Sequence, residues 1–87
     1  MTDKIEEMKE AIIDGDEERA AEATREALDE GAEPQEAIKA ASKVLGEVGD
    51  KYDSGEYFLF DLVASGDAMN AAREILEEAI FAEGGER

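Results

Sequence analysis

The chain contains no histidine, and this absence removes more kinds of chemistry than any other. Without an imidazole there is no histidine metal ligand, no histidine general base and no Ser-His or Cys-His nucleophile pair. The Glu-x-x-His pattern of carboxylate di-iron bundles is excluded for the same reason. Cysteine is also absent, which excludes disulfides and thiolate metal sites and fits a reducing cytoplasm, the location we expect. We therefore predict no catalytic and no metal-binding residue.

Long apolar runs and basic residues are both scarce. No run approaches the ~20 apolar residues that cross a bilayer, and the acidic N-terminus lacks the apolar segment of a secretory signal. Nine basic residues stand against 25 acidic ones, a formal net charge of −16. This charge repels phosphate backbones and anionic lipid, so we expect neither nucleic acid nor a membrane as a partner. Plain solvation, a basic partner and a salt-rich cytoplasm each account for the acidity, and all three stay open.

Two acidic segments, 14–18 and 50–56, have a superficial likeness to calcium-binding loops. Neither keeps the alternating ligand positions and the final bidentate Glu of an EF-hand loop. We interpret both as helix caps and solvated faces.

The residues that are abundant, Ala, Glu, Leu and Ile, favour helices, and one proline in 87 residues interrupts few of them. Apolar spacings of three and four predict helices from about Thr2 to Asp14, between Asp16 and Gly31, from Pro34 past Tyr52, and from about Phe58 or Leu59 to Ala82. The connections are short, so the predicted fold is all-α: a four-helix antiparallel up-down bundle. We expect one helical domain over residues 1–83, followed by a tail or the start of a linker at 84–87.

Local signals also predict the helix ends and the faces that pack. The signals for the ends are Thr2 or Asp3 as first cap, Gly15, Asp16 as second cap, Gly31 and Pro34 at the first position of the third helix. The predicted core row of the third helix is Ile38, Ala41, Leu45, Val48 and Tyr52, and that of the fourth is Leu62, Ser65, Met69, Ala72, Leu76 and Ala79. We interpret Gly46, Gly49 and Gly66 as places where another backbone approaches closely.

Large apolar side chains crowd around the turn Ser54-Gly55-Glu56, which is unusual because turns are normally small and polar. A hairpin of the third and fourth helices brings these side chains to one end of the bundle: Tyr52, Phe58, Leu59 and Leu62. Such a cluster either plugs one end of the core or forms a surface that covers something apolar.

The stretch from Val48 to Met69 resembles the helical cap domain of corrinoid proteins. The likeness lies in Val48-Gly49-Asp50, Tyr52, Gly55-Glu56-Tyr57-Phe58-Leu59, Leu62-Val63-Ala64-Ser65 and Met69, and earlier in Gly15-Asp16, the segment 26–31 and Pro34. That family includes the cap of cobalamin-dependent methionine synthase and the small corrinoid proteins of methanol and methylamine methyl transfer. Three positions depart from the family pattern: Phe60 replaces a proline, Tyr52 replaces the commoner Phe, and Gly66 replaces another small residue.

The resemblance implies that the chain covers the upper face of a cobalamin or other corrinoid cofactor and shields the methyl–cobalt group during methyl transfer. The residues it implies at the corrinoid are Tyr52 and Leu59, with Leu62 as a further contact and Phe58 beside them. The family's Rossmann-like domain supplies the lower cobalt ligand from an Asp-x-His-x-x-Gly loop, which this chain lacks. The chain is then not catalytic alone, and its implied partners are that domain, in cis or in trans, and methyltransferase proteins. The alternative is a non-catalytic interaction module, a homodimer when isolated, with the same cluster as its interface.

Overall fold

The computed structural model of the chain describes residues 3–82, which form four helices joined by short connections. The helices are α1 (Lys4–Asp14), α2 (Glu17–Asp29), α3 (Pro34–Asp53) and α4 (Leu59–Ala82). The predicted all-α fold of four helices is confirmed. The predicted Thr2 cap and the tail at 84–87 lie outside the described residues, and the domain limit at residue 83 stays a prediction. Within residues 3–82, none of the helices is both long enough and apolar enough to cross a bilayer.

The helix ends follow the capping signals in the sequence. The carboxylate of Asp3 accepts hydrogen bonds from the backbone N–H groups of Ile5 and Glu6, and that of Asp16 accepts one from Arg19. Gly15 ends α1 with a left-handed backbone, φ 73°, as a C-cap glycine should. Pro34 occupies the first turn of α3, where its missing N–H is no loss. These expectations are confirmed.

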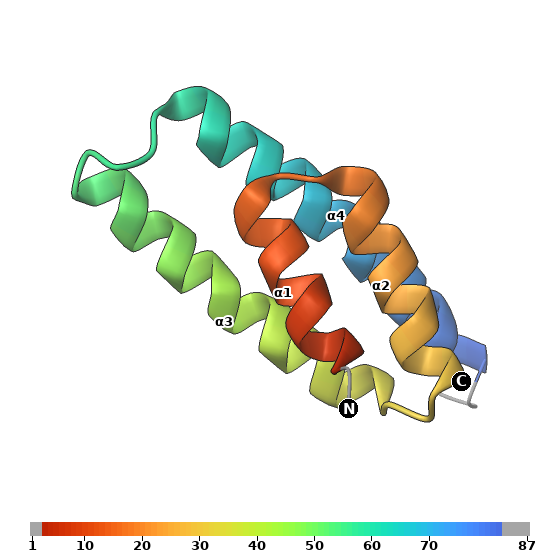
Figure 1. Cartoon of the computed structure of the whole chain (residues 1–87). Coiled ribbons are helices and arrows are strands. Elements are labelled where there is room, and N and C mark those ends of the chain that lie inside the picture. The colour runs from red at the N-terminus through yellow and green to blue at the C-terminus, as the bar shows by residue number, and fades with distance from the viewer. Residues whose placement is uncertain (1–2, 83–87) are drawn as a thin grey trace.

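The four helices form a bundle in which α1 and α4 each pack against the other three. Figure 1 shows consecutive helices running in opposite directions, with α1 between α2 and α3. Helix α1 packs against all three others, and α4 packs against both α2 and α3. The α3–α4 hairpin extends past the turn between α1 and α2, so no other helix within residues 3–82 covers its far end (Figure 1). That uncovered end holds the unusual turn.

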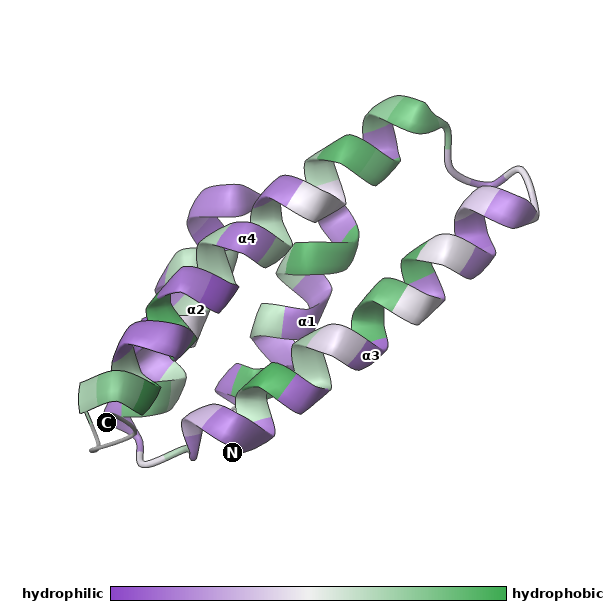
Figure 2. Cartoon of the chain, turned by 180° about the vertical axis from the view of Figure 1, so that it is seen from behind, coloured by the Kyte–Doolittle hydropathy of each residue, from purple (hydrophilic) through white to green (hydrophobic). Residues whose placement is uncertain are grey.

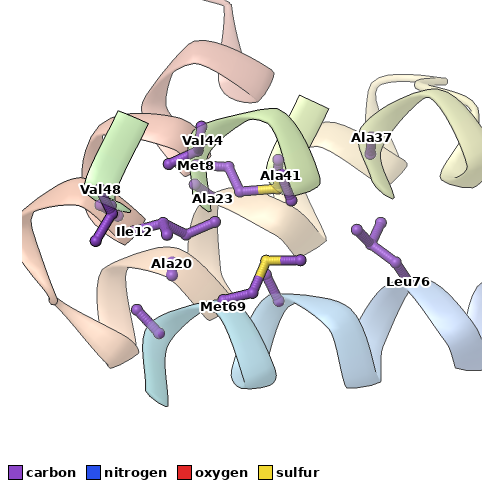
Figure 3. Close-up of a cluster of buried hydrophobic side chains, with 13 residues drawn as sticks. Met8, Ile12, Ala20, Ala23, Ala37, Ala41, Val44, Val48, Met69 and Leu76 are labelled. Carbon is purple, nitrogen blue, oxygen red and sulfur yellow. The ribbon is translucent and has the colours of Figure 1, made fainter. Parts of the chain in front are cut away.

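The core is built from a few medium-sized side chains separated by alanines. Its largest fully buried apolar residues are Met8, Ile12, Val44, Val48 and Leu76. Figure 3 shows them converging from α1, α3 and α4, with the alanines Ala20, Ala23, Ala37 and Ala41 among them. Alanines allow neighbouring helices to approach closely, since little side chain separates their axes. The predicted core row of α4 is largely confirmed: Ser65, Met69, Ala72 and Leu76 are buried, whereas Leu62 and Ala79 are half-buried.

The predicted core row of α3 is partly wrong. The buried residues are Pro34, Ala37, Ala41, Val44 and Val48. The predicted members Leu45 and Tyr52 are 41% and 44% exposed, and Ile38 is half-buried. The row that packs on α1 and α4 is thus the smaller one, which lets α3 lie close to its neighbours. The bulkier row of Ile38, Leu45 and Tyr52, spaced by seven residues, lies on the flank of the helix.

Three glycines do not play the role predicted for them. A Cβ atom added to Gly46, Gly49 or Gly66 would meet no heavy atom within 4 Å. No backbone therefore approaches these positions, and the close-packing interpretation is wrong. Gly46 is exposed, and although Gly49 and Gly66 are half-buried, nothing packs directly against them. At Gly49 and Gly66 the result is open space beside the uncovered hairpin end.

Candidate functional site

The candidate site is the apolar surface at the turn end of the α3–α4 hairpin. We call it the hairpin surface and define it by Leu45, Tyr52, Phe58, Leu59, Leu62 and Val63. Figure 2 shows the first turns of α4, next to the loop from α3, coloured mostly as hydrophobic. Large apolar side chains left open to solvent in a cluster mark a surface that binds something.

Each helix of the hairpin contributes one row to this surface. On α3, Leu45 and Tyr52 are seven residues apart and so share a face, with the bare Gly49 between them. On α4, Leu59, Leu62, Val63 and Gly66 follow spacings of three, four and seven and also share a face. Because neither glycine carries a side chain, each row has an open position where a flat group could approach.

The four residues predicted from the sequence all lie at this end of the molecule. Phe58 and Leu59 are 72% and 63% exposed, and Tyr52 is 44% exposed. Leu62 is half-buried and packs against the core cluster. The first three thus form a surface and do not plug the core. Their contact with a corrinoid stays a prediction.

Sequence reasoning missed three exposed apolar residues near the site. Leu45 was assigned to the core, whereas Val63, 54% exposed, and Phe60, 89% exposed, were given no binding role. The seven-residue spacing from Ile38 to Tyr52 was a usable signal for Leu45, because it defines a second row beside the buried one. Phe60 lies about 100° around α4 from Leu59, so it extends the apolar area onto a different side of the helix.

Backbone hydrogen bonds shape the turn that carries the site. The carbonyl oxygen of Lys51 accepts the N–H groups of Glu56 and Tyr57, at 2.9 and 3.0 Å, which closes the loop. The Nζ of Lys51 is 3.1 Å from Oε2 of Glu56, and this hydrogen bond raises the pKa of Lys51 above its ordinary value. At the start of α4 the N–H of Phe58 donates to the carboxylate of Asp61 at 3.0 Å, half of a capping box. Helix α4 therefore begins at Leu59 without the proline usual in the family.

The side chains of this surface suit covering an apolar group. Tyr52 has the only titratable side chain of the hairpin surface. Among the described residues, no three His, Cys, Asp or Glu side chains are grouped so as to hold a metal ion. Apolar side chains can exclude water from whatever lies against them, and that is what this arrangement offers.

Comparison with known proteins identifies the family. The profile of a family described as a B12 binding domain matches residues 4–77. The chain belongs to this family. The match covers α1, α2, α3 and most of α4. The resemblance to corrinoid proteins that the sequence indicated is confirmed.

Individual relatives of this B12 binding domain agree with the family match. Trimethylamine corrinoid protein 1 of Methanosarcina acetivorans is 40% identical over 74 residues, which cover 84% of this chain and 34% of the relative. A corrinoid protein of Desulfitobacterium hafniense is 37% identical over 81 residues, 92% of this chain and 38% of the relative. Monomethylamine corrinoid protein 2 of Methanosarcina mazei is 38% identical over 76 residues, which cover 86% of this chain and 35% of the relative. The chain spans about a third of the length of these relatives. No solved structure matches it.

Proposed function

We propose that this chain is the helical cap of a corrinoid methyl-carrier protein and that its hairpin surface covers the upper face of the bound corrinoid. One observation carries the proposal: a domain of the B12 binding family leaves Tyr52, Phe58 and Leu59 open to solvent beside one turn. In a protein with so few large apolar residues, their exposure calls for an occupant that is itself apolar.

The residues of the hairpin surface fit a corrinoid. A corrin ring presents a broad, flat and largely apolar face, and the two rows of the surface are broad, apolar and interrupted by the open positions at Gly49 and Gly66. When bound, the group supplies a cobalt centre that carries the methyl group. Tyr52 and Leu59 would lie against the methyl side, with Phe58 and Leu62 beside them, and their role is to keep water and oxygen away.

The other half of such a site must come from outside this chain. The chain contains no histidine, so a histidine ligand to cobalt belongs to a separate Rossmann-like domain, in cis or in trans. Methyltransferase proteins are the proposed partners, and methyl transfer itself is the work of cobalt and those partners. The cytoplasm is the proposed location.

The experiment uses the natural protein that contains this chain, loaded with cobalamin. In Leu59→Ala and Tyr52→Ala variants, the rate at which reduced cobalt is oxidised in air is followed by its visible absorption. We expect oxidation to become several-fold faster in both variants. The matched control is Phe81→Ala, which removes a 69% exposed ring at the other end of α4 and should leave the rate unchanged. Equal rates in all variants would refute the cap function.

A simpler experiment asks where the cobalt ligand comes from. The native gene is read beyond the codon for Arg87. A frame that continues into an α/β segment with Asp-x-His-x-x-Gly places cap and corrinoid domain in one polypeptide. A stop codon there leaves only the assembly in trans.

A second candidate function is self-association through the same surface, and the exposure of Phe58, Leu59 and Phe60 favours it. In this case the chain is an interaction module, and sedimentation of the free chain should reveal a dimer. Leu59→Ser would then disperse the dimer, while Leu59→Ala in the cobalamin-loaded protein would leave cobalt oxidation unchanged.

A further inference from the structure

The carbonyl oxygen of Ile13, in the last turn of α1, accepts two hydrogen bonds from distant parts of the chain. The hydroxyl of Tyr57 donates to it at 2.6 Å, and the hydroxyl of Ser65 donates to it at 3.2 Å. Carbonyls in the last turn of a helix have no partner within the helix and need one elsewhere. Both donors belong to the turn end of the hairpin, so this carbonyl ties α1 to the element that carries the candidate site.

The two donors are placed differently. Ser65 is fully buried in the row of α4 that faces the core. Tyr57 is half-buried and lies in the loop just before α4. Ser65 therefore joins two helices that already pack together, whereas Tyr57 joins α1 to the loop before α4, and its side chain also packs against the core cluster.

Tyr57 also makes two contacts with Lys51. The ammonium of Lys51 lies 5.6 Å from the centre of the Tyr57 ring, within the range of a cation–π contact. The carbonyl of the same lysine accepts the N–H of Tyr57. Tyr57 is thus held at three points: the face of its ring, its backbone N–H and its hydroxyl.

The neighbours of these two residues in the sequence are the exposed residues of the hairpin surface. Lys51 precedes Tyr52, and Tyr57 precedes Phe58 and Leu59. Side chains that are 44% to 72% exposed have few contacts of their own to hold them. Their placement depends on the backbone between Lys51 and Leu59, and the bond from Tyr57 to Ile13 fixes that backbone against α1.

We propose that Tyr57 is a positioning residue, whose hydroxyl, bonded to the carbonyl of Ile13, holds Tyr52, Phe58 and Leu59 in the arrangement offered to the corrinoid. This inference rests on the proposed cap function and adds a residue that does not itself touch the corrinoid. A surface fixed before binding loses less conformational entropy when its partner arrives.

The first arm of the test measures the turn and needs no cofactor. In Tyr57→Phe the ring and its contact with Lys51 remain and only the hydroxyl is removed. Hydrogen exchange of the N–H groups of Glu56 and Tyr57 should become about fivefold faster, the effect of losing one ordinary hydrogen bond on local opening. Exchange in the middle of α4, at Ala72, should not change. The control is Tyr52→Phe, which removes the other tyrosine hydroxyl and should leave exchange at the turn unchanged.

The second arm measures air oxidation of cobalt in the cobalamin-loaded natural protein, with Leu59→Ala as the positive control. Faster exchange together with faster oxidation in Tyr57→Phe supports the proposal. Unchanged exchange at the turn overturns it, whatever the cobalt does. Faster exchange with normal oxidation also overturns it if Leu59→Ala accelerates oxidation, and then the cap function survives. If Leu59→Ala has no effect either, the cap function fails and the positioning role fails with it.

Discussion

A Cβ atom placed on Gly15 would lie 2.6 Å from the Cβ of Ala64, closer than real Cβ contacts come. Gly15 also has a φ of 73°, in the left-handed region that other residues adopt only at a cost. The turn between α1 and α2 therefore meets α4 at a point where both the conformation and the space require glycine. This contact lies next to Ser65, whose hydroxyl binds the Ile13 carbonyl.

Replacing Gly15 by alanine should lower the free energy of unfolding by about 2–4 kcal/mol, since backbone strain and overpacking add. The control is Gly46→Ala, in an exposed position of α3 with no heavy atom within 4 Å. That change should raise the free energy of unfolding by up to ~1 kcal/mol, because alanine favours helix. Urea unfolding of both variants measures these effects. A Gly15→Ala variant as stable as the parent would show that the turn does not meet α4.

Truncation of two leucines of α4 should have very different effects on stability. Leu76 is fully buried, so Leu76→Ala should cost about 2–5 kcal/mol of stability. Leu59 is 63% exposed, so Leu59→Ala should change stability by no more than about 0.5 kcal/mol. Thermal unfolding followed by circular dichroism separates the two cases. A loss of 3 kcal/mol or more in Leu59→Ala would mean that Leu59 belongs to the core and not to a surface.

Added salt should stabilise the protein. The net charge of −16 means that acidic side chains repel one another in the folded protein, and salt screens that repulsion. Screening also weakens surface ion pairs such as Lys4–Glu26, at 3.0 Å, but solvent-exposed pairs of this kind contribute little to stability. Between 10 mM and 0.5 M NaCl we expect Tm to rise by about 4 °C or more, the equivalent of ~1 kcal/mol.

The comparison for the salt experiment is the double variant Glu22→Gln, Glu78→Gln, which removes two exposed carboxylates. Its Tm should rise less over the same range of salt. A Tm that falls with salt would mean that ion pairs outweigh the net repulsion.

Alkaline pH should loosen the turn end of the hairpin. The Glu56 carboxylate raises the pKa of Lys51 above its ordinary 10.5 in the folded protein. A raised pKa means that the contribution of this lysine is fully present below 10.5 and is lost as pH rises through the folded value. The Tm of the parent should therefore fall more steeply than that of Lys51→Met above pH 10.5, with no such difference between pH 7 and 9. Parallel curves would show that the Lys51–Glu56 pair contributes nothing.

The helix ends were predictable because capping is local. Each capping residue acts within one turn of its own position, so the local sequence contains the whole signal, as at Asp3, Gly15, Asp16 and Pro34. Periodicity was a weaker guide in α3, where two adjacent rows share the helix. The predicted core row took residues from both: its members Ala41 and Val48 are buried as expected, whereas Leu45 and Tyr52 are exposed.

Contacts between residues far apart in the sequence could not be predicted. The bond from Tyr57 to the Ile13 carbonyl joins residues 44 positions apart, and a backbone carbonyl has no signature in a sequence. In the same way, the sequence does not distinguish a glycine that lets another backbone approach from a glycine that faces open space. Gly66 was assigned to the first kind and belongs to the second.

The placement of the two tyrosines has an optical consequence. The chain has no tryptophan, and Tyr52 and Tyr57 are its only tyrosines, both beside the turn at the uncovered end of the hairpin. Its tyrosine fluorescence therefore comes entirely from that end. A molecule that settles on the hairpin surface should alter the emission, whereas one that binds along α2 or at the far end of α4 should not. The protein thus contains an intrinsic probe of its own candidate site, and occupancy can be read without any label.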